Sequence, residues 1–238
     1  MQLRSARSNL RMLALAGATC LSAGPEPDLV DVATVNPHIV IELRYATANN
    51  FTRKKLYDVE RCFLRRDVAA RLSAVQQDLM QVGLGLKVWD GYRPRSVQRA
   101  LWAASPSPGF VSIPSRGSRH NRGAAVDVTL VDFPSKQELA MPTPYDEFSV
   151  RANAHYSGLP ENVMRNRTLL QRAMTKRGFQ ILRTEWWHFD AVDWRDYPLA
   201  DIPLSELART SGKLPGEAKI PVAMEEETAR TVQARQGP

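Results

Sequence analysis

The residues with the clearest chemical potential lie in the stretch SRHNRGAAVD, residues 118–127, which places His120 and Asp127 seven positions apart. Gly123 marks a turn between them, and Asp127 sits between two valines in a β-rich run where an unpaired carboxylate would be costly. Imidazole and carboxylate are ligands of catalytic zinc sites, which need a third protein ligand and an open position for water. This stretch therefore predicts half of a metal site.

The third ligand is expected in Glu185-Trp-Trp-His188. A hydrolytic zinc enzyme needs a carboxylate beside the metal to take a proton from water and later deliver it to the leaving group, and Glu185 is the candidate. Positions three apart in a regular strand point to opposite faces. Glu185 must therefore lie in a turn before the strand or be re-aimed by a bulge, and the sequence leaves both open. Locally, a core aromatic strand with a chance histidine would look the same.

Arg93, in Gly91-Tyr-Arg-Pro94 at the end of a predicted strand, is the candidate electrophile. A guanidinium near a scissile carbonyl stabilises the negative charge that develops on its oxygen. Taken alone, this tetrapeptide is typical of a simple turn.

Together the three motifs, S-x-H-x-x-G-x-A-x-D, E-x-W-H and G-Y-R-P, resemble those of the zinc D-alanyl-D-alanine dipeptidases. These enzymes are relatives of the vancomycin-resistance dipeptidase, within the broader D,D-peptidase and hedgehog-like fold. The resemblance extends over about residues 30–200 in the same motif order, and the joint pattern is far more specific than any single motif.

The resemblance implies one zinc ion per subunit, held by His120, Asp127 and His188. It also implies that Glu185 acts as general base and acid and that Arg93 stabilises the transition state.

For the substrate, the resemblance implies that Ser118 helps to hold the carboxylate and that Asp146 binds the free ammonium group. Residues 43–51 resemble the N-terminal segment of the family, which adds Tyr45 to the expected substrate-binding residues.

The function implied is hydrolysis of the dipeptide D-Ala-D-Ala to two D-alanine molecules, in a small site whose charged groups read both termini. One alternative is a D,D- or L,D-carboxypeptidase that acts on peptidoglycan stem peptides, in which the amine end of the site would be open. A second is a non-catalytic, zinc-stabilised binding module. The presence of both Glu185 and Arg93 argues against it, because metal binding alone needs neither.

The elements that must position these residues are read from hydrophobic spacing. The apolar stripe of residues 66–82, with Asp67 as the candidate cap, predicts the clearest helix. Helices are also expected at 96–104 and 161–177, and strands at 38–45, 86–90, 125–130, 179–183 and 186–190, the last two as an antiparallel hairpin. Helices and strands without a βαβ rhythm indicate an α+β fold, a central antiparallel sheet flanked by helices with the zinc site on the sheet.

The chain of 238 residues is expected to form one domain over residues 24–204, beginning with a proline-containing linker at 24–36. Residues 1–23 carry a basic start, a short apolar run and small residues, as in a secretory signal peptide. This predicts a periplasmic or otherwise extracytoplasmic protein, with an uncleaved cytoplasmic form as the alternative. Residues 205–238 lack aromatic residues and are expected to be a largely disordered tail.

Composition limits the partners. Of the net charge of +7, residues 1–23 carry +3 and the tail none, which leaves +4 for the domain. Such a weak excess argues against nucleic-acid binding, and no segment after the N-terminus approaches the ~20 apolar residues of a membrane span. A small dipeptide is therefore the expected partner. Of the two cysteines, Cys62 is predicted to be a buried apolar residue, because no reactive motif surrounds it.

Overall fold

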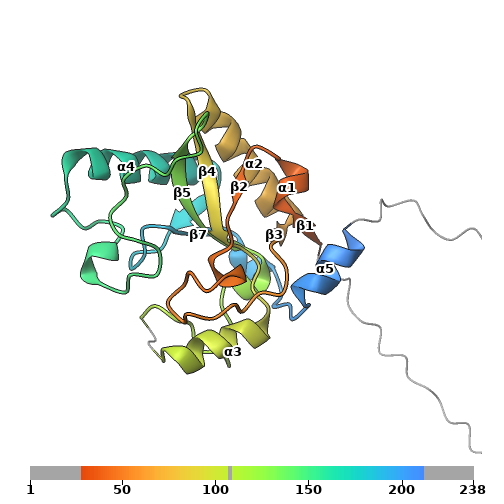
Figure 1. Ribbon diagram of the computed structural model, residues 1–238. Helices are drawn as coiled ribbons and strands as arrows, with labels where there is room; N and C mark the ends of the chain where they lie inside the picture. Colours follow the sequence, from red (N-terminus) through yellow and green to blue (C-terminus); the bar gives the residue numbers. More distant parts are fainter. Residues whose placement is uncertain (1–27, 107–108, 212–238) are drawn as a thin grey trace, which may run out of the picture.

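A five-stranded sheet forms the centre of the structure, a computed structural model that describes residues 28–106 and 109–211 (Figure 1). Its strands lie in the order β2 (Val40–Ile41), β4 (Leu84–Asp90), β5 (Ala125–Asp132), β7 (His188–Ala191) and β6 (Phe179–Ile181). All neighbours pair antiparallel except β2 and β4, which are parallel. The predicted α+β fold is confirmed, including the β6–β7 hairpin, with one parallel pair at the edge.

Strand β5 shows how the sequence divides the two faces of this sheet. Val126, Val128 and Leu130 alternate with Asp127 and Thr129, and successive side chains of a strand point to opposite faces. The valines and the leucine are completely buried in the hydrophobic core. The other face carries the polar residues and therefore the candidate site.

Two long helices pack against the sheet and against each other, so they cover the same face: α2 (Arg66–Met80) and α4 (Glu161–Lys176). The apolar stripe predicted for α2 is buried in its first four members, which are Val68, Leu72, Val75 and Leu79. The predicted fifth member, Val82, is 63% exposed because the helix ends before it. Asp67 lies in the first turn but is not the cap, which is Arg65, whose side chain makes no capping hydrogen bond to the helix.

A β-bulge in β4 changes which residues of that strand face the site. Val88 pairs with Val128, but the next paired residue is Asp90, opposite Asp127, so Trp89 is the extra residue. Two residues on one strand then oppose one on the other, and the alternation of side chains shifts by one position. Asp90 is thereby turned to the face of Asp127, whereas regular alternation would have placed it with Val88.

Helix α3 (Arg95–Ala104) follows β4 at the end of the sheet that carries the candidate site (Figure 1). Four single-turn 3-10 helices complete the loops of the described chain, η1 (Arg44–Ala46), η2 (His120–Arg122), η3 (Val150–Ala152) and η4 (Trp194–Asp196). Cys62 is 2% exposed within the core, as predicted.

The two ends of the predicted domain need correction. The expected linker contains β1 (Leu29–Asp31), which pairs antiparallel with β3 (Phe63–Arg65), followed by α1 (Val32–Val35). The strand predicted at residues 38–45 is reduced to β2 and η1.

At the C-terminal end, the tail predicted from residue 205 begins instead as helix α5 (Leu204–Thr210), whose Leu204 and Leu207 are buried. Two leucines three positions apart were enough to dock one short helix. The predicted signal peptide at 1–23 and the tail from 212 lie outside the described residues. No helix within the described ranges is long and apolar enough to cross a membrane.

Candidate metal centre and substrate cavity

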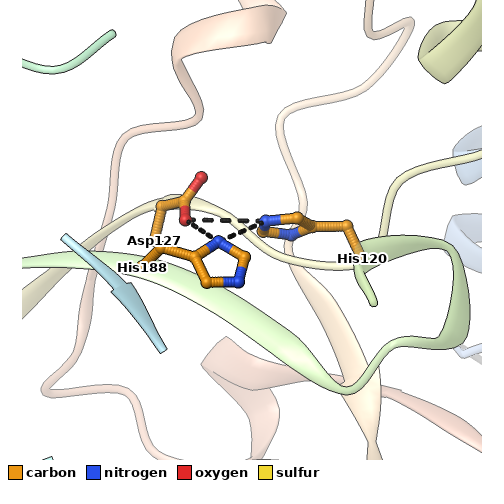
Figure 2. A group of neighbouring side chains, drawn as sticks. All are labelled: His120, Asp127 and His188. Carbon is orange, nitrogen blue, oxygen red and sulfur yellow. Dashed lines mark hydrogen bonds and ion pairs between the residues drawn. The ribbon is translucent and has the colours of Figure 1, made fainter. Parts of the chain in front are cut away.

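Three buried side chains from separate elements converge on one point, as Figure 2 shows. The register of β5 and β7 places Asp127 directly opposite His188, and His120 approaches from η2. Nδ1 of His188 lies 3.0 Å from Oδ1 of Asp127 and 3.2 Å from Nε2 of His120. One ligand atom from each residue lies within 4.8 Å of the other two. The predicted metal-binding set is therefore assembled.

Hydrogen bonds outside the triad fix which nitrogen of each histidine faces it. Nδ1 of His120 lies 2.7 Å from the carbonyl oxygen of Gly91, which can only accept, so this nitrogen carries the proton and Nε2 is left as a ligand. Nε2 of His188 lies 2.8 Å from Oδ1 of Asp190. Its Nδ1 is therefore the ligand atom. Such outer carboxylate and carbonyl partners are a regular feature of metal-binding histidines.

The electrostatics of the triad suit a cation. Burial alone would lower the pKa of His188, but the carboxylates of Asp190 and Asp127 hold that pKa well above its usual value. Burial alone would raise the pKa of Asp127, yet His120 and His188 hold it below the ordinary range. A buried carboxylate that stays ionised beside two imidazoles is a suitable donor set for a divalent metal.

Glu185 lies beside the triad in the connection between β6 and β7, not within a strand. The turn alternative left open by the sequence is therefore correct, and no bulge is involved. Its Oε2 lies 3.9 Å from Nδ1 of His188. Burial, supported by the negative charge of Asp127, raises the pKa of Glu185 to about 8. A carboxyl group with that pKa can both accept and release a proton near neutral pH.

Arg93 is buried and held in place by Asp90, which accepts bonds from its Nε at 3.0 Å and its Nη2 at 2.5 Å. A third bond runs from Nη1 to Oε1 of Gln98, at 2.9 Å. The other carboxylate oxygen of Asp90 accepts the hydroxyl of Tyr57 at 2.5 Å. The guanidinium is thus fixed before any ligand arrives.

Asp146 lies on another wall of the same cavity, where the hydroxyl of Tyr45 lies 3.2 Å from both its carboxylate oxygens. Burial, supported by the charge of Asp127, raises the pKa of Asp146 to about 7. Its backbone adopts a positive φ of 60°, which is uncommon outside glycine and aims the side chain from a tight turn. Tyr45 and Asp146, both predicted to bind substrate, therefore form one acidic subsite in the cavity.

Ser118 is placed by Asn121, which sequence reasoning did not single out. The backbone N–H of Ser118 donates to Oδ1 of Asn121, and the Ser118 hydroxyl accepts from the backbone N–H of Asn121 at 3.2 Å. Nδ2 of Asn121 also donates to the carbonyl oxygen of Arg93 at 2.7 Å. The side-chain amide of Asn121 therefore links the segment that carries Ser118 to the segment that carries Arg93.

All eight predicted site residues line a single small cavity of about 50 Å³: Tyr45, Arg93, Ser118, His120, Asp127, Asp146, Glu185 and His188. Three phenylalanines from different loops form another part of its lining. Phe148 stacks on Phe110 with a centroid distance of 4.9 Å and meets Phe51 edge-on at 5.1 Å. The cavity therefore combines a polar floor with an aromatic wall.

Three further contributors were missed by the sequence: Asp90, Asp190 and Tyr145, whose hydroxyl donates to Oδ2 of Asp127 at 2.9 Å. Asp190 carried a usable signal, because it lies two positions after His188 in a strand and must share its face. Asp90 carried none, since its orientation depends on the bulge.

Comparison with known proteins agrees with this geometry. A family model described as D-Ala-D-Ala dipeptidase matches residues 25–202. A D-alanyl-D-alanine dipeptidase of Escherichia coli (strain K12) is 40% identical over 172 residues, which are 72% of this chain and 89% of that protein. Proteins of the same name from Enterococcus faecalis and Streptomyces coelicolor are 31% and 30% identical, with 66% and 67% of this chain and 87% and 92% of theirs covered.

Proposed function

Since the chain belongs to the D-Ala-D-Ala dipeptidase family, we propose that it is a zinc-dependent peptidase that hydrolyses D-Ala-D-Ala to two D-alanine molecules. The observation that carries this proposal is the convergence of a metal-binding triad, a buried carboxyl group, a fixed guanidinium and an acidic subsite on one small cavity.

The donor set supports zinc as the metal. Two imidazoles and one carboxylate, with outer partners that fix both imidazole tautomers, match the three protein ligands of catalytic zinc sites. When bound there, zinc would lower the pKa of a water molecule and polarise the peptide carbonyl.

Glu185 would carry the proton. Its raised pKa of about 8 means that it can take the proton of the attacking water and hold it until the peptide bond breaks. The same oxygen then delivers the proton to the amine of the departing D-alanine. Arg93, already fixed by Asp90, would stabilise the negative charge that develops on the carbonyl oxygen.

Recognition of both termini would restrict the substrate to a dipeptide. Asp146, oriented by Tyr45, would pair with the ammonium group, and Ser118 would bind the carboxylate. The alternative, a carboxypeptidase for peptidoglycan stem peptides, has no free ammonium at this position, so its substrate would place a neutral amide against Asp146. That mismatch favours the dipeptidase.

The test is a comparison of D-Ala-D-Ala with a stem pentapeptide ending in D-Ala-D-Ala, on the zinc-loaded full chain. We expect release of D-alanine from the dipeptide alone. Comparable kcat/KM values for both substrates would favour the carboxypeptidase, and zinc binding without release from either would favour the non-catalytic module.

We also propose an extracytoplasmic location, supported by the composition of residues 1–23. Sequencing the N-terminus of the mature protein from the native host tests this. An intact N-terminal methionine region would contradict it.

A further inference from the structure

A second pocket, of about 250 Å³, lies beside the catalytic cavity and has strongly basic walls. We call it the arginine pocket, defined by the side chains of Arg116, Arg119, Arg122 and Trp194, with Ser112 and Ser118 at its border. No acidic side chain lines it among the described residues. Its walls therefore offer positive charge and hydrogen-bond donors.

The ring of Trp194 contacts two of the arginines that line the pocket. The guanidinium groups of Arg119 and Arg122 lie 4.8 Å and 5.5 Å from the centre of its ring, within cation–π range. Arg195 approaches the same ring at 4.3 Å but does not line the pocket.

The arginines are only partly neutralised. Nε of Arg119 lies 3.3 Å from Oδ2 of Asp190, a carboxylate that also accepts from His188. Arg122 donates to a backbone carbonyl, that of Tyr197. Arg116 is exposed and forms no ion pair with any residue that the structure describes. Positive charge thus exceeds negative charge in a concave site, which concentrates anions.

The pocket adjoins the catalytic cavity directly, because Ser112, Ser118 and Arg119 line both. Ser118 is the residue proposed to meet the carboxylate end of the substrate. The arginine pocket and the catalytic cavity therefore share the wall that carries Ser118.

We propose that the arginine pocket is a separate binding site for a small anion that carries a carboxylate or phosphate group. Guanidinium groups bind both groups through charge-assisted, often paired hydrogen bonds. Two sources offer this chemistry, a free amino acid such as D-alanine and inorganic phosphate. The site stands apart from the metal triad and needs no metal.

Isothermal titration calorimetry of the metal-free full chain at low ionic strength tests this, with inorganic phosphate and D-alanine as separate probes. We expect saturable binding of at least one probe. Phosphate binding alone would assign the pocket to inorganic anions, and D-alanine binding would assign it to the carboxylate of an amino acid.

A matched pair of variants locates the binding. Arg116→Glu and Arg195→Glu make the same charge change near the same indole, but only Arg116 lines the pocket. We expect Arg116→Glu to weaken binding about tenfold or more, because it replaces a charge-assisted donor by a repulsive group, and Arg195→Glu to change it less than about threefold. The milder Arg116→Gln should show an intermediate loss and guards against misfolding.

An equal loss in both charge-reversal variants would mean unspecific attraction and would overturn the proposal. So would binding that is unchanged in Arg116→Glu, or no saturable binding of either probe. Because these readouts use metal-free protein, they are independent of whether D-Ala-D-Ala is the substrate.

Discussion

Oδ1 of Asp190 lies 2.8 Å from Nε2 of His188, on the side of the ring that faces away from the metal-binding triad. This contact orients the ring and directs Nδ1 toward Asp127 and His120. Outer carboxylates of this kind typically contribute about 10–100-fold to metal affinity.

We therefore predict that Asp190→Asn weakens zinc binding by about 10–100-fold, measured by competition with a chelating dye. The matched control is Asp196→Asn, an exposed aspartate outside the site, which should bind zinc as the wild type does. Unchanged affinity in Asp190→Asn would mean that His188 is positioned by other contacts.

Replacement of Glu185 by Gln should separate chemistry from metal binding. The amide keeps the shape but cannot carry a proton, so we expect kcat to fall by about 10²–10⁴-fold. Zinc content by atomic absorption should stay at the wild-type level, because Glu185 is not among the three converging ligands. Wild-type turnover by a zinc-loaded Glu185→Gln enzyme would rule out the assigned role.

The acidic position at Asp146 predicts a pH dependence of KM. Its pKa is raised to about 7, so the group is ionised above that pH and protonated below it. Its ion pair with the substrate ammonium should therefore be lost as the pH falls through 7, and KM for D-Ala-D-Ala should rise. Steady-state kinetics from pH 5.5 to pH 8.5, about 1.5 units on either side of this pKa, would measure this.

Asp146→Asn serves as the control for that measurement. It should have a high KM at every pH, because its side chain has no charge to lose. The interpretation fails if wild type and Asp146→Asn share the same pH profile of KM.

The hydroxyl of Tyr57 supports Arg93 indirectly, through Asp90. Tyr57→Phe leaves the buried carboxylate without one of its partners, so we expect a loss of about 1–3 kcal/mol in the free energy of unfolding. A fall in kcat should accompany it, because Arg93 loses its fixed position. Chemical denaturation and steady-state kinetics measure the two effects.

Tyr92→Phe provides the comparison. The hydroxyl of Tyr92 bonds to the backbone of Ile202, near helix α5 and apart from the Arg93 contacts. We expect a similar loss of stability with kcat unchanged. Equal effects of both variants on kcat would show that general destabilisation, rather than the position of Arg93, limits the reaction.

The sequence predicted the long elements well because their apolar periodicity is strong. The stripe of α2 and the hairpin of β6 and β7 could be read directly. Short elements were missed where contacts with distant parts of the chain, rather than local sequence, determine the secondary structure. The strand β1 has three residues and exists through pairing with β3, and α5 has seven residues and is docked by two leucines.

In the candidate site, the residues of the motifs could be predicted from the sequence. The residues that hold them in place by hydrogen bonds could not. The eight predicted residues line one cavity. Their association could be predicted because the family resemblance grouped residues that are far apart in the sequence. Asp90, Tyr57 and Asn121 act through hydrogen bonds between segments 28–33 residues apart in sequence, which no local pattern encodes. Glu185 shows the limit of prediction from sequence. Its spacing to His188 required either a turn or a bulge, and the backbone of the structure shows that it lies in a turn.

The extra residue Trp89 in β4 has a consequence for how this protein tolerates change in its gene. Substitutions along β4 leave the pairing register intact, whereas deletion of one codon near residue 89 would remove the bulge. Val88 and Asp90 would then be consecutive in a regular strand, still opposite Val128 and Asp127, so Asp90 would keep its face and its bonds to Arg93. Related chains that lack the extra residue but keep the motifs should therefore retain this anchor, and they would lose the ring contacts that Trp89 makes with Tyr145 and Trp186.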